Sequence, residues 1–324
     1  MKKIVTRPDF LEPEGGRGSR RRRRRRRAIF AALALVLLGG VGIAIHRYRA
    51  AHEFPPPAFE DEACRQTYVN FYRNPEIDVK VVFGYKDARP ARFVADRYER
   101  MIFIQRLTAK CTKKNFACDF VRSKTDADLL LRRLNGPDGK PRTIFLRAVP
   151  SSVGPDDEEN RVDPFQKWRT RYANLAFLQG LTSADAVIYN GHSRAGGGPD
   201  FAPPRLAKDL DVDFEWYRKN EPGFTPIVST LEGAPSRLKL LGLYSCASSK
   251  HFLDRVRKVK PDLGLITSPK LIYFSDALES SIESISSLLA MKCEGAFRHS
   301  LTKARTRASG AQVSGFFEEE ESAD

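Results

Sequence analysis

Short apolar runs and helix-period segments alternate between residues 79 and 291. The runs are rich in β-branched and aliphatic residues, and the segments that separate them have the 3.6-residue period of amphipathic helices. We expect strands at VKVVFGY (79–85), RTIFLRAV (142–149), DAVIYNG (185–191), LKLLGLYS (238–245) and LGLIT (263–267). We expect helices over residues 91–109, 166–181, 251–259 and 276–291.

The last three of these runs are almost continuously apolar, as expected for strands that are covered on both faces. Strand, helix, strand order of this kind predicts an α/β fold, a three-layer sandwich with a mostly parallel sheet. Two weaker segments, 116–121 and 127–133 with a turn at 135–139, fit an inserted hairpin or edge strands.

A different apolar pattern precedes the domain. Residues 28–45, AIFAALALVLLGGVGIAI, contain no charged side chain. At 1.5 Å per residue this stretch spans about 27 Å as a helix, close to the hydrocarbon thickness of a bilayer. A cleaved signal peptide would end in a small-residue site, whereas His46, Arg47, Tyr48 and Arg49 follow here. We therefore expect an uncleaved single-pass signal-anchor, with the lipid bilayer as its partner.

Charge is concentrated before this stretch. The chain has a formal net charge of +15, and residues 1–27 hold twelve basic residues against three acidic ones, including the arginine run 20–27. This asymmetry places the N-terminus in the cytoplasm, the run at anionic lipid headgroups, and the main domain in the periplasm or an equivalent exterior space. A nucleic-acid or nuclear-targeting role is the alternative for the run. We expect no nucleic-acid partner.

These patterns divide the chain into five parts. AHEFPPPAFE (51–60) contains three consecutive prolines, typical of an extended spacer, and the C-terminal end is acidic and rich in small polar residues. The parts are a basic cytoplasmic segment (1–27), a transmembrane helix (28–45), a Pro-rich linker (46–60), an extracytoplasmic α/β domain (61–308) and an acidic disordered tail (309–324).

Reactive side chains follow two of the predicted strands. His192 and Ser193 come directly after the strand at 185–191, and Cys246 ends the strand at 238–245 where a helix begins. In a parallel sheet both strand ends meet at one edge, where sites lie. A helix N-terminus and a nearby imidazole favour the thiolate of Cys246, so the sequence predicts a Cys/His pair.

The two segments resemble the caspase and gingipain group of cysteine peptidases. Tyr189-Asn190-Gly191-His192 is similar to the gingipain histidine segment, and Tyr244-Ser245-Cys246 to its nucleophile segment. The resemblance implies the same α/β sandwich, a dyad of Cys246 and His192, and an oxyanion hole from the backbone amides of Ser193 and Cys246. The position after the histidine is usually glycine in that group, whereas Ser193 stands here.

A glycine-rich loop follows the histidine and is the candidate substrate-contacting segment. A plain surface loop is the alternative. The substrate-loop residues are Arg194, Gly196, Gly197, Gly198 and Asp200.

The five cysteines of the chain are an odd number in a domain predicted to face an oxidising compartment. Cys64, Cys111, Cys118 and Cys293 lie away from the predicted strand ends and can form two disulfides, which leaves Cys246 free. The spacing suits Cys111 with Cys118 and then Cys64 with Cys293, and other pairings remain open. Five reduced, buried cysteines are the alternative.

A rival mechanism uses Ser193, because Gly191-His192-Ser193-Arg194-Ala195 fits a loose nucleophile elbow of α/β-hydrolases. Asp262 or Asp276 with His299 would complete its triad, although the glycines after Ser193 make a poor first helical turn. No residue spacing indicates a metal site or a phosphate-binding loop, so we expect no metal and no cofactor. The sequence thus predicts a membrane-anchored cysteine hydrolase with a peptide or protein substrate; a Ser193 hydrolase and a non-catalytic binding domain are the alternatives.

Overall fold

The structure is a computed structural model that describes residues 59–88, 93–112, 115–233, 235–303 and 310–317. Its strands are β1 (Glu76–Phe83), β2 (Asp87–Ala88), β3 (Phe93–Val94), β4 (Val121–Arg122), β5 (Leu129–Asn135), β6 (Pro141–Pro150), β7 (Ala186–Asn190), β8 (Leu240–Tyr244), β9 (Gly264–Thr267) and β10 (Gln312–Ser314). Its α-helices are α2 (Glu62–Phe71), α3 (Asp96–Thr108), α4 (Asp157–Val162), α5 (Pro164–Ser183), α6 (Phe214–Asn220), α7 (Phe224–Gly233), α8 (Asp254–Val259), α9 (Phe274–Leu289) and α10 (Glu294–Lys303).

Eight of the described strands form one mixed sheet in the order β10-β9-β8-β7-β1-β6-β5-β4. The five central strands, from β9 to β6, run parallel to one another, and β10, β5 and β4 are antiparallel to their neighbours. This arrangement confirms the predicted α/β class and the mostly parallel sheet. The weak segments belong to an antiparallel edge, where β5 and β6 form a hairpin, but only Val121 of 116–121 is in a strand.

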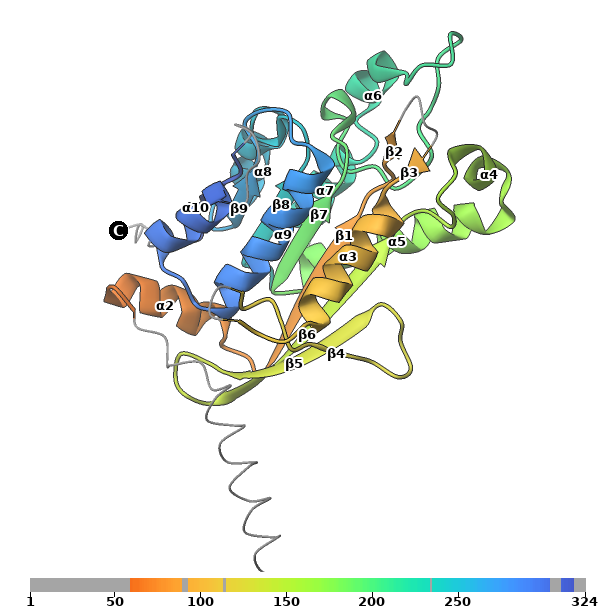
Figure 1. The fold of residues 1–324 in the computed structure, drawn as a ribbon. Coiled ribbons are helices and arrows are strands. Elements are labelled where there is room, and N and C mark those ends of the chain that lie inside the picture. Colours follow the sequence, from red (N-terminus) through yellow and green to blue (C-terminus); the bar gives the residue numbers. More distant parts are fainter. Residues whose placement is uncertain (1–58, 89–92, 113–114, 234, 304–309, 318–324) are drawn as a thin grey trace, which may run out of the picture. The chain divides into compact units, whose positions relative to one another are not determined.

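Apolar side chains on the two faces of the sheet build two separate cores. Val81 and Ile188 belong to the core shared with α2, α3, α9 and α10, whereas Val82 and Val187 belong to the core shared with α5, α7 and α8. In Figure 1, α3 and α9 lie in front of the central strands and α5 passes behind them. Both faces are therefore covered, and this explains the continuously apolar runs in the sequence.

Aspartate side chains cap the N-termini of several helices. Asp61, Asp156, Asp163 and Asp213 each accept a hydrogen bond from a backbone N–H in the first turn of α2, α4, α5 and α6, respectively. An aspartate at this position satisfies a donor that the helix itself leaves unpaired, and its charge is favourable at the positive end of the helix dipole.

Two disulfides join distant and local parts of the domain. Cys64 in α2 is bonded to Cys293, which directly precedes α10, and Cys111 is bonded to Cys118 after α3. Of the five cysteines in the sequence, Cys246 alone is free. The prediction of disulfides is confirmed, and the pairing is the one that the spacing favours.

The prediction of a disordered tail from residue 309 is wrong for its first part. Residues 312–314 form β10 against the free edge of β9, and Phe316 is only 8% exposed. The ring of Phe316 packs on Tyr68, Phe71 and Phe297. Apolar burial by the two phenylalanines before the acidic run thus extends the folded domain to at least residue 317.

The predicted basic segment 1–27, the transmembrane helix 28–45 and most of the linker 46–60 lie outside the described residues. Among the helices that the structure does describe, none has the length and apolar character needed to cross a bilayer.

Candidate functional site

The register of β7 and β8 brings His192 and Cys246 to the same edge of the sheet. Asn190, the last residue of β7, is paired with Tyr244, the last residue of β8. The next residue, Gly191, donates its backbone N–H to the carbonyl oxygen of Tyr244 at 3.1 Å. His192 and Cys246 each lie two residues beyond the paired strand ends, at equivalent positions on neighbouring parallel strands.

This edge is also the topological switch point of the sheet. From β1 the chain crosses to β6 on one side, then to β7 on the other side of β1, and afterwards adds β8 and β9 outwards. In open α/β sheets, ligands bind beyond the carboxyl ends of the strands where the order reverses. The residues that follow β1 and β7 therefore occupy the place where the fold positions a site.

His192 lies in a partly buried position, with 24% of its side chain exposed. Its ring centroid is 5.4 Å from that of Phe274, and its Nε2 is 3.7 Å from Oδ1 of Asp87. Nε2 makes no hydrogen bond within the described part of the chain. Burial lowers the pKa of His192 to about 3, the cations Arg194 and Lys86 lower it too, and Asp87 opposes this. His192 is therefore neutral at pH 7 in the resting protein.

Cys246 stands at the start of a sharp reversal of the chain. Ala247, the next residue, has a left-handed backbone conformation with φ of 51°, which is uncommon for a residue other than glycine. A π-helix, Ser249–Leu253, follows and continues into α8. The Cys246 Sγ lies 3.7 Å from the carbonyl oxygen of Ile272. The sulfur is therefore held between the end of β8 and the segment that enters α9.

The backbone amides predicted to form an oxyanion hole have no partner. Within the described residues, neither the N–H of Ser193 nor that of Cys246 donates a hydrogen bond. Buried or half-buried amide donors are normally paired, so the two unpaired amides beside the candidate dyad can donate hydrogen bonds to an anionic oxygen.

The substrate-loop residues Arg194 and Asp200 are directed towards the protein. Arg194 is 4% exposed, and its guanidinium contacts Asp87 at 2.9 Å and Asp200 at 3.1 Å. Asp200 also accepts a hydrogen bond from the hydroxyl of Tyr217 at 2.9 Å. Burial acts to raise the pKa of Asp87, but the charge and hydrogen bond of Arg194 hold it below its usual value. This network fixes the loop to the end of β1.

The glycines of the same loop are explained by close packing. A Cβ on Gly197 would lie 3.0 Å from Tyr217 in α6, and a Cβ on Gly198 would lie 2.1 Å from the backbone nitrogen of Phe224 in α7. Gly196 and Gly198 also have positive φ, as do Arg194 and Ala195. The loop is thus a tight, one-turn structure against α6 and α7.

A buried lysine completes this edge and was not predicted from the sequence. Lys86 follows β1, is fully buried, and donates hydrogen bonds to Glu99 and to Oδ1 of Asn190. Its Nζ lies 4.8 Å from the ring centroid of Phe274, the same ring that contacts His192. His192 and Cys246 were identified because they are polar residues that come directly after an apolar strand. The same rule also selects Lys86 and Asp87, which follow the run 79–85.

Two of the partners proposed for a Ser193 triad, His299 and Asp262, lie away from Ser193. His299 is exposed on α10, and Asp262 precedes β9 and so lies at the opposite edge of the sheet. Ser193 precedes a single 3-10 turn, Arg194–Gly196, and the elbow motif requires a helix there.

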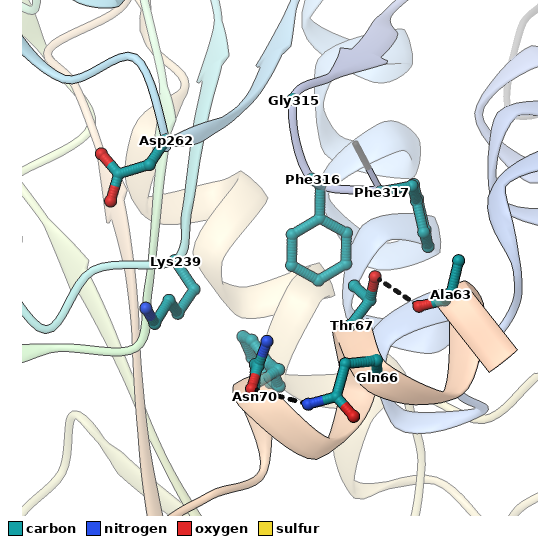
Figure 2. A pocket seen from close by; sticks show the side chains of 10 residues that line it. Ala63, Gln66, Thr67, Asn70, Lys239, Asp262, Gly315, Phe316 and Phe317 are labelled. Carbon is teal, nitrogen blue, oxygen red and sulfur yellow. Dashed lines mark hydrogen bonds between the residues drawn. The ribbon is translucent and has the colours of Figure 1, made fainter. Parts of the chain in front are cut away.

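A cavity of about 400 Å³ lies at that opposite edge, by the amino ends of β8 and β9. Figure 2 shows side chains of α2 on one side of the cavity and Lys239 and Asp262 on the other, with Phe316 between them. The lining residues are Ala63, Gln66, Thr67, Asn70, Phe71, Lys239, Asp262, Gly315, Phe316 and Phe317. Of the residues predicted for a site, only Asp262, the candidate triad acid, lines it; neither His192, Cys246 nor the substrate loop takes part.

Fold and site together define the chain as an α/β sandwich with a cysteine and a histidine on neighbouring strands at the carboxyl edge of a mostly parallel sheet. A search against protein-family models found no match, and a search of curated proteins found none either.

Proposed function

We propose that the chain is a cysteine hydrolase that cleaves peptide or protein substrates with a dyad of Cys246 and His192, in the manner of the caspase and gingipain group. The observation that supports the proposal most is the register of β7 and β8, which brings both residues to the carboxyl edge of the sheet, with His192 at the switch point and Cys246 on the neighbouring strand. The unpaired Nε2 of His192 and the unpaired amides of Ser193 and Cys246 support it.

The proposed reaction needs a base, a nucleophile and donors for an oxyanion. The His192 imidazole takes the thiol proton, and the Cys246 sulfur bonds to the substrate carbonyl carbon while the carbonyl oxygen becomes an anion that accepts hydrogen bonds from the two amides. When the C–N bond breaks, the imidazolium returns its proton to the leaving amine. Water then attacks the thioester, gives one proton to His192 and releases the carboxylic acid, and the thiolate recovers the proton. The nearby Asp87 carboxylate stabilises the transient imidazolium.

The proposed setting is the outer side of a cytoplasmic membrane. Residues 28–45 have the length and apolar character of an anchor, and the basic residues before them favour a cytoplasmic N-terminus. The two disulfides support a domain that folds in an oxidising compartment.

Thiol labelling of the oxidised, full-length protein tests the dyad directly, because Cys246 is its free cysteine. We expect iodoacetamide to modify one site and Cys246→Ala to abolish the modification. His192→Ala should slow hydrolysis of a mixed fluorogenic peptide library by about 100-fold or more. His251→Ala, a partly exposed histidine in the π-helix after Cys246, is the matched control and should retain activity.

Each alternative has its own result. Hydrolysis that survives Cys246→Ala but is lost in Ser193→Ala would replace the proposal with a serine hydrolase. Labelling of Cys246 without hydrolysis of any peptide in the library would contradict the hydrolase and favour a binding domain.

A further inference from the structure

Helix α5 carries apolar side chains on two opposite faces. On the inner face, Ala173, Phe177 and Leu181 belong to the core that α5 shares with α7 and α8. The outer face carries four large apolar residues with the spacing i, i+3, i+7 and i+10, which places them on one side of a helix. The members of this apolar stripe are Phe165 (68% exposed), Trp168 (60%), half-buried Tyr172 and Leu175 (46%). A surface helix normally directs polar residues outwards, so the fold itself does not explain the stripe.

The aromatic part of the stripe is held in place by the domain. The rings of Trp168 and Tyr172 are stacked, with centroids 5.5 Å apart and planes 10° from parallel. The guanidinium of Arg169 lies 5.3 Å from the ring centroid of Tyr172, and its Nε donates a hydrogen bond to the carbonyl oxygen of Pro150 at 2.8 Å. Because the aromatic pair is already ordered, a partner that covers it pays little for fixing these side chains.

The charges of α5 favour an anionic partner. The helix has 20 residues, of which Lys167, Arg169 and Arg171 are basic and none is acidic. Lys167 and Arg171 are exposed, and neither makes an ion pair within the described residues. The acidic residues of α4 and the N-cap Asp163 precede the helix. Exposed aromatic rings beside unpaired cations fit a bilayer with anionic headgroups. A second copy of the same face would bring further cations, which repel.

We propose that the apolar stripe of α5 docks the domain on the surface of a lipid bilayer, with Trp168 and Leu175 at the boundary of headgroups and acyl chains and with Lys167 and Arg171 at anionic headgroups. The inference rests on the proposed membrane setting and is independent of the dyad. The 13 residues from 46 to 58 span at most about 45 Å, close to the diameter of a domain of this size, so the anchor allows a side face to reach the bilayer. Docking would fix the orientation of the carboxyl edge relative to the membrane.

The chain has two tryptophans, Trp168 and Trp216, so each can be observed alone. The full-length protein is reconstituted into vesicles of phosphatidylcholine and phosphatidylglycerol, with or without bromine on the acyl chains, which quenches tryptophan emission on contact. In Trp216→Phe we expect bromine to quench Trp168 by about half or more, since the apolar face of an interfacial helix lies about 5–10 Å into the headgroup and acyl boundary. In Trp168→Phe the emission of Trp216, whose ring packs on Arg205 and Tyr217, should be almost unchanged.

Two matched pairs of substitutions, both made in Trp216→Phe, test the role of charge. Lys167→Glu combined with Arg171→Glu should weaken the quenching of Trp168, because both new carboxylates face anionic headgroups. Arg218→Glu combined with Lys219→Glu makes the same change of charge at exposed residues of α6 and should leave the quenching intact. An equal loss in both variants would overturn the specific role of α5, because the effect would then be one of net charge.

Flotation of the vesicles on a density gradient separates this inference from the others. Protein that floats with the vesicles while Trp168 stays unquenched would overturn the docking face and leave the anchor intact. Protein that does not float would overturn both the docking face and the membrane setting. Trp168 emission that depends on protein concentration and not on bromine would assign the stripe to contact between two copies. Quenching of Trp168 in a protein that cleaves no peptide would support the docking face and contradict only the hydrolase.

Discussion

The two disulfides close chain loops of very different length, and this difference predicts how much each contributes to stability. The bond between Cys64 and Cys293 spans 229 positions, whereas the bond between Cys111 and Cys118 spans 7. A cross-link lowers the entropy of the unfolded chain in proportion to the logarithm of the loop length. At room temperature this gives about 5 kcal/mol for the long loop and about 2.5 kcal/mol for the short one.

The test compares two double variants, Cys64→Ala with Cys293→Ala and Cys111→Ala with Cys118→Ala. Each removes two sulfurs and leaves Cys246 in place, so the contributions from lost side-chain atoms are similar. Guanidinium unfolding followed by circular dichroism should show a loss in the free energy of unfolding that is larger by about 2 to 3 kcal/mol for the long loop. Equal losses, or a larger loss for the short loop, would refute the argument from loop length.

Three further changes test other parts of the structure by the free energy of unfolding. Protonating a histidine whose folded pKa is about 3, below the ordinary 6.5, favours unfolding, so stability should fall as the pH drops from 6.5 towards 3. His192→Gln should remove that part of the pH dependence, and an unchanged slope would contradict the buried, neutral ring. Gly198→Ala should cost more than about 2 kcal/mol, because φ is 96° and the new methyl group meets the backbone of α7, whereas Gly295→Ala in α10 meets nothing within 4 Å and should not destabilise. Phe316→Ala should cost about 3 kcal/mol or more if the chain after β10 belongs to the fold, whereas the 68% exposed Phe165 should tolerate alanine.

The central sheet could be predicted because its information is local. Each parallel strand is an apolar run bounded by polar residues, and the pattern needs no knowledge of the partner strand. The shared edge of His192 and Cys246 followed from the same local signal and one general rule on parallel strands. The pairing of the cysteines could be predicted for a similar reason. Cys111 and Cys118 are close in the sequence, and Cys246 stands at a strand end, so Cys64 and Cys293 are left for the second disulfide.

The electrostatics of the site could not be predicted, because the partners are far apart in the sequence. Lys86 is buried by Asn190, which is 104 positions away, and Arg194 by Asp87, which is 107 positions away. A lysine or an arginine after a strand normally points to solvent, so each was either overlooked or assigned to a substrate loop. The prediction for the C-terminal tail failed for the opposite reason. It relied on the acidic run and gave too little weight to the two phenylalanines that precede it.

Three of the seven described non-glycine residues with positive φ lie next to His192 and Cys246 at the carboxyl edge of the sheet, and the open cavity lies at the opposite edge. Arg194 and Ala195, which follow His192, and Ala247, which follows Cys246, have positive φ without being glycine. Such conformations cost of order 1–3 kcal/mol each and persist only where the surroundings hold them. The cavity by α2, β8 and β9 has none of these features, since its walls are surface side chains and a few aromatic rings. The strained residues and the buried charged side chains at the carboxyl edge each oppose folding, whereas unstrained or apolar substitutes would not. Their occurrence beside Cys246 and His192 is therefore a stronger physical argument for function at the carboxyl edge than the volume of the cavity is for function at the opposite edge.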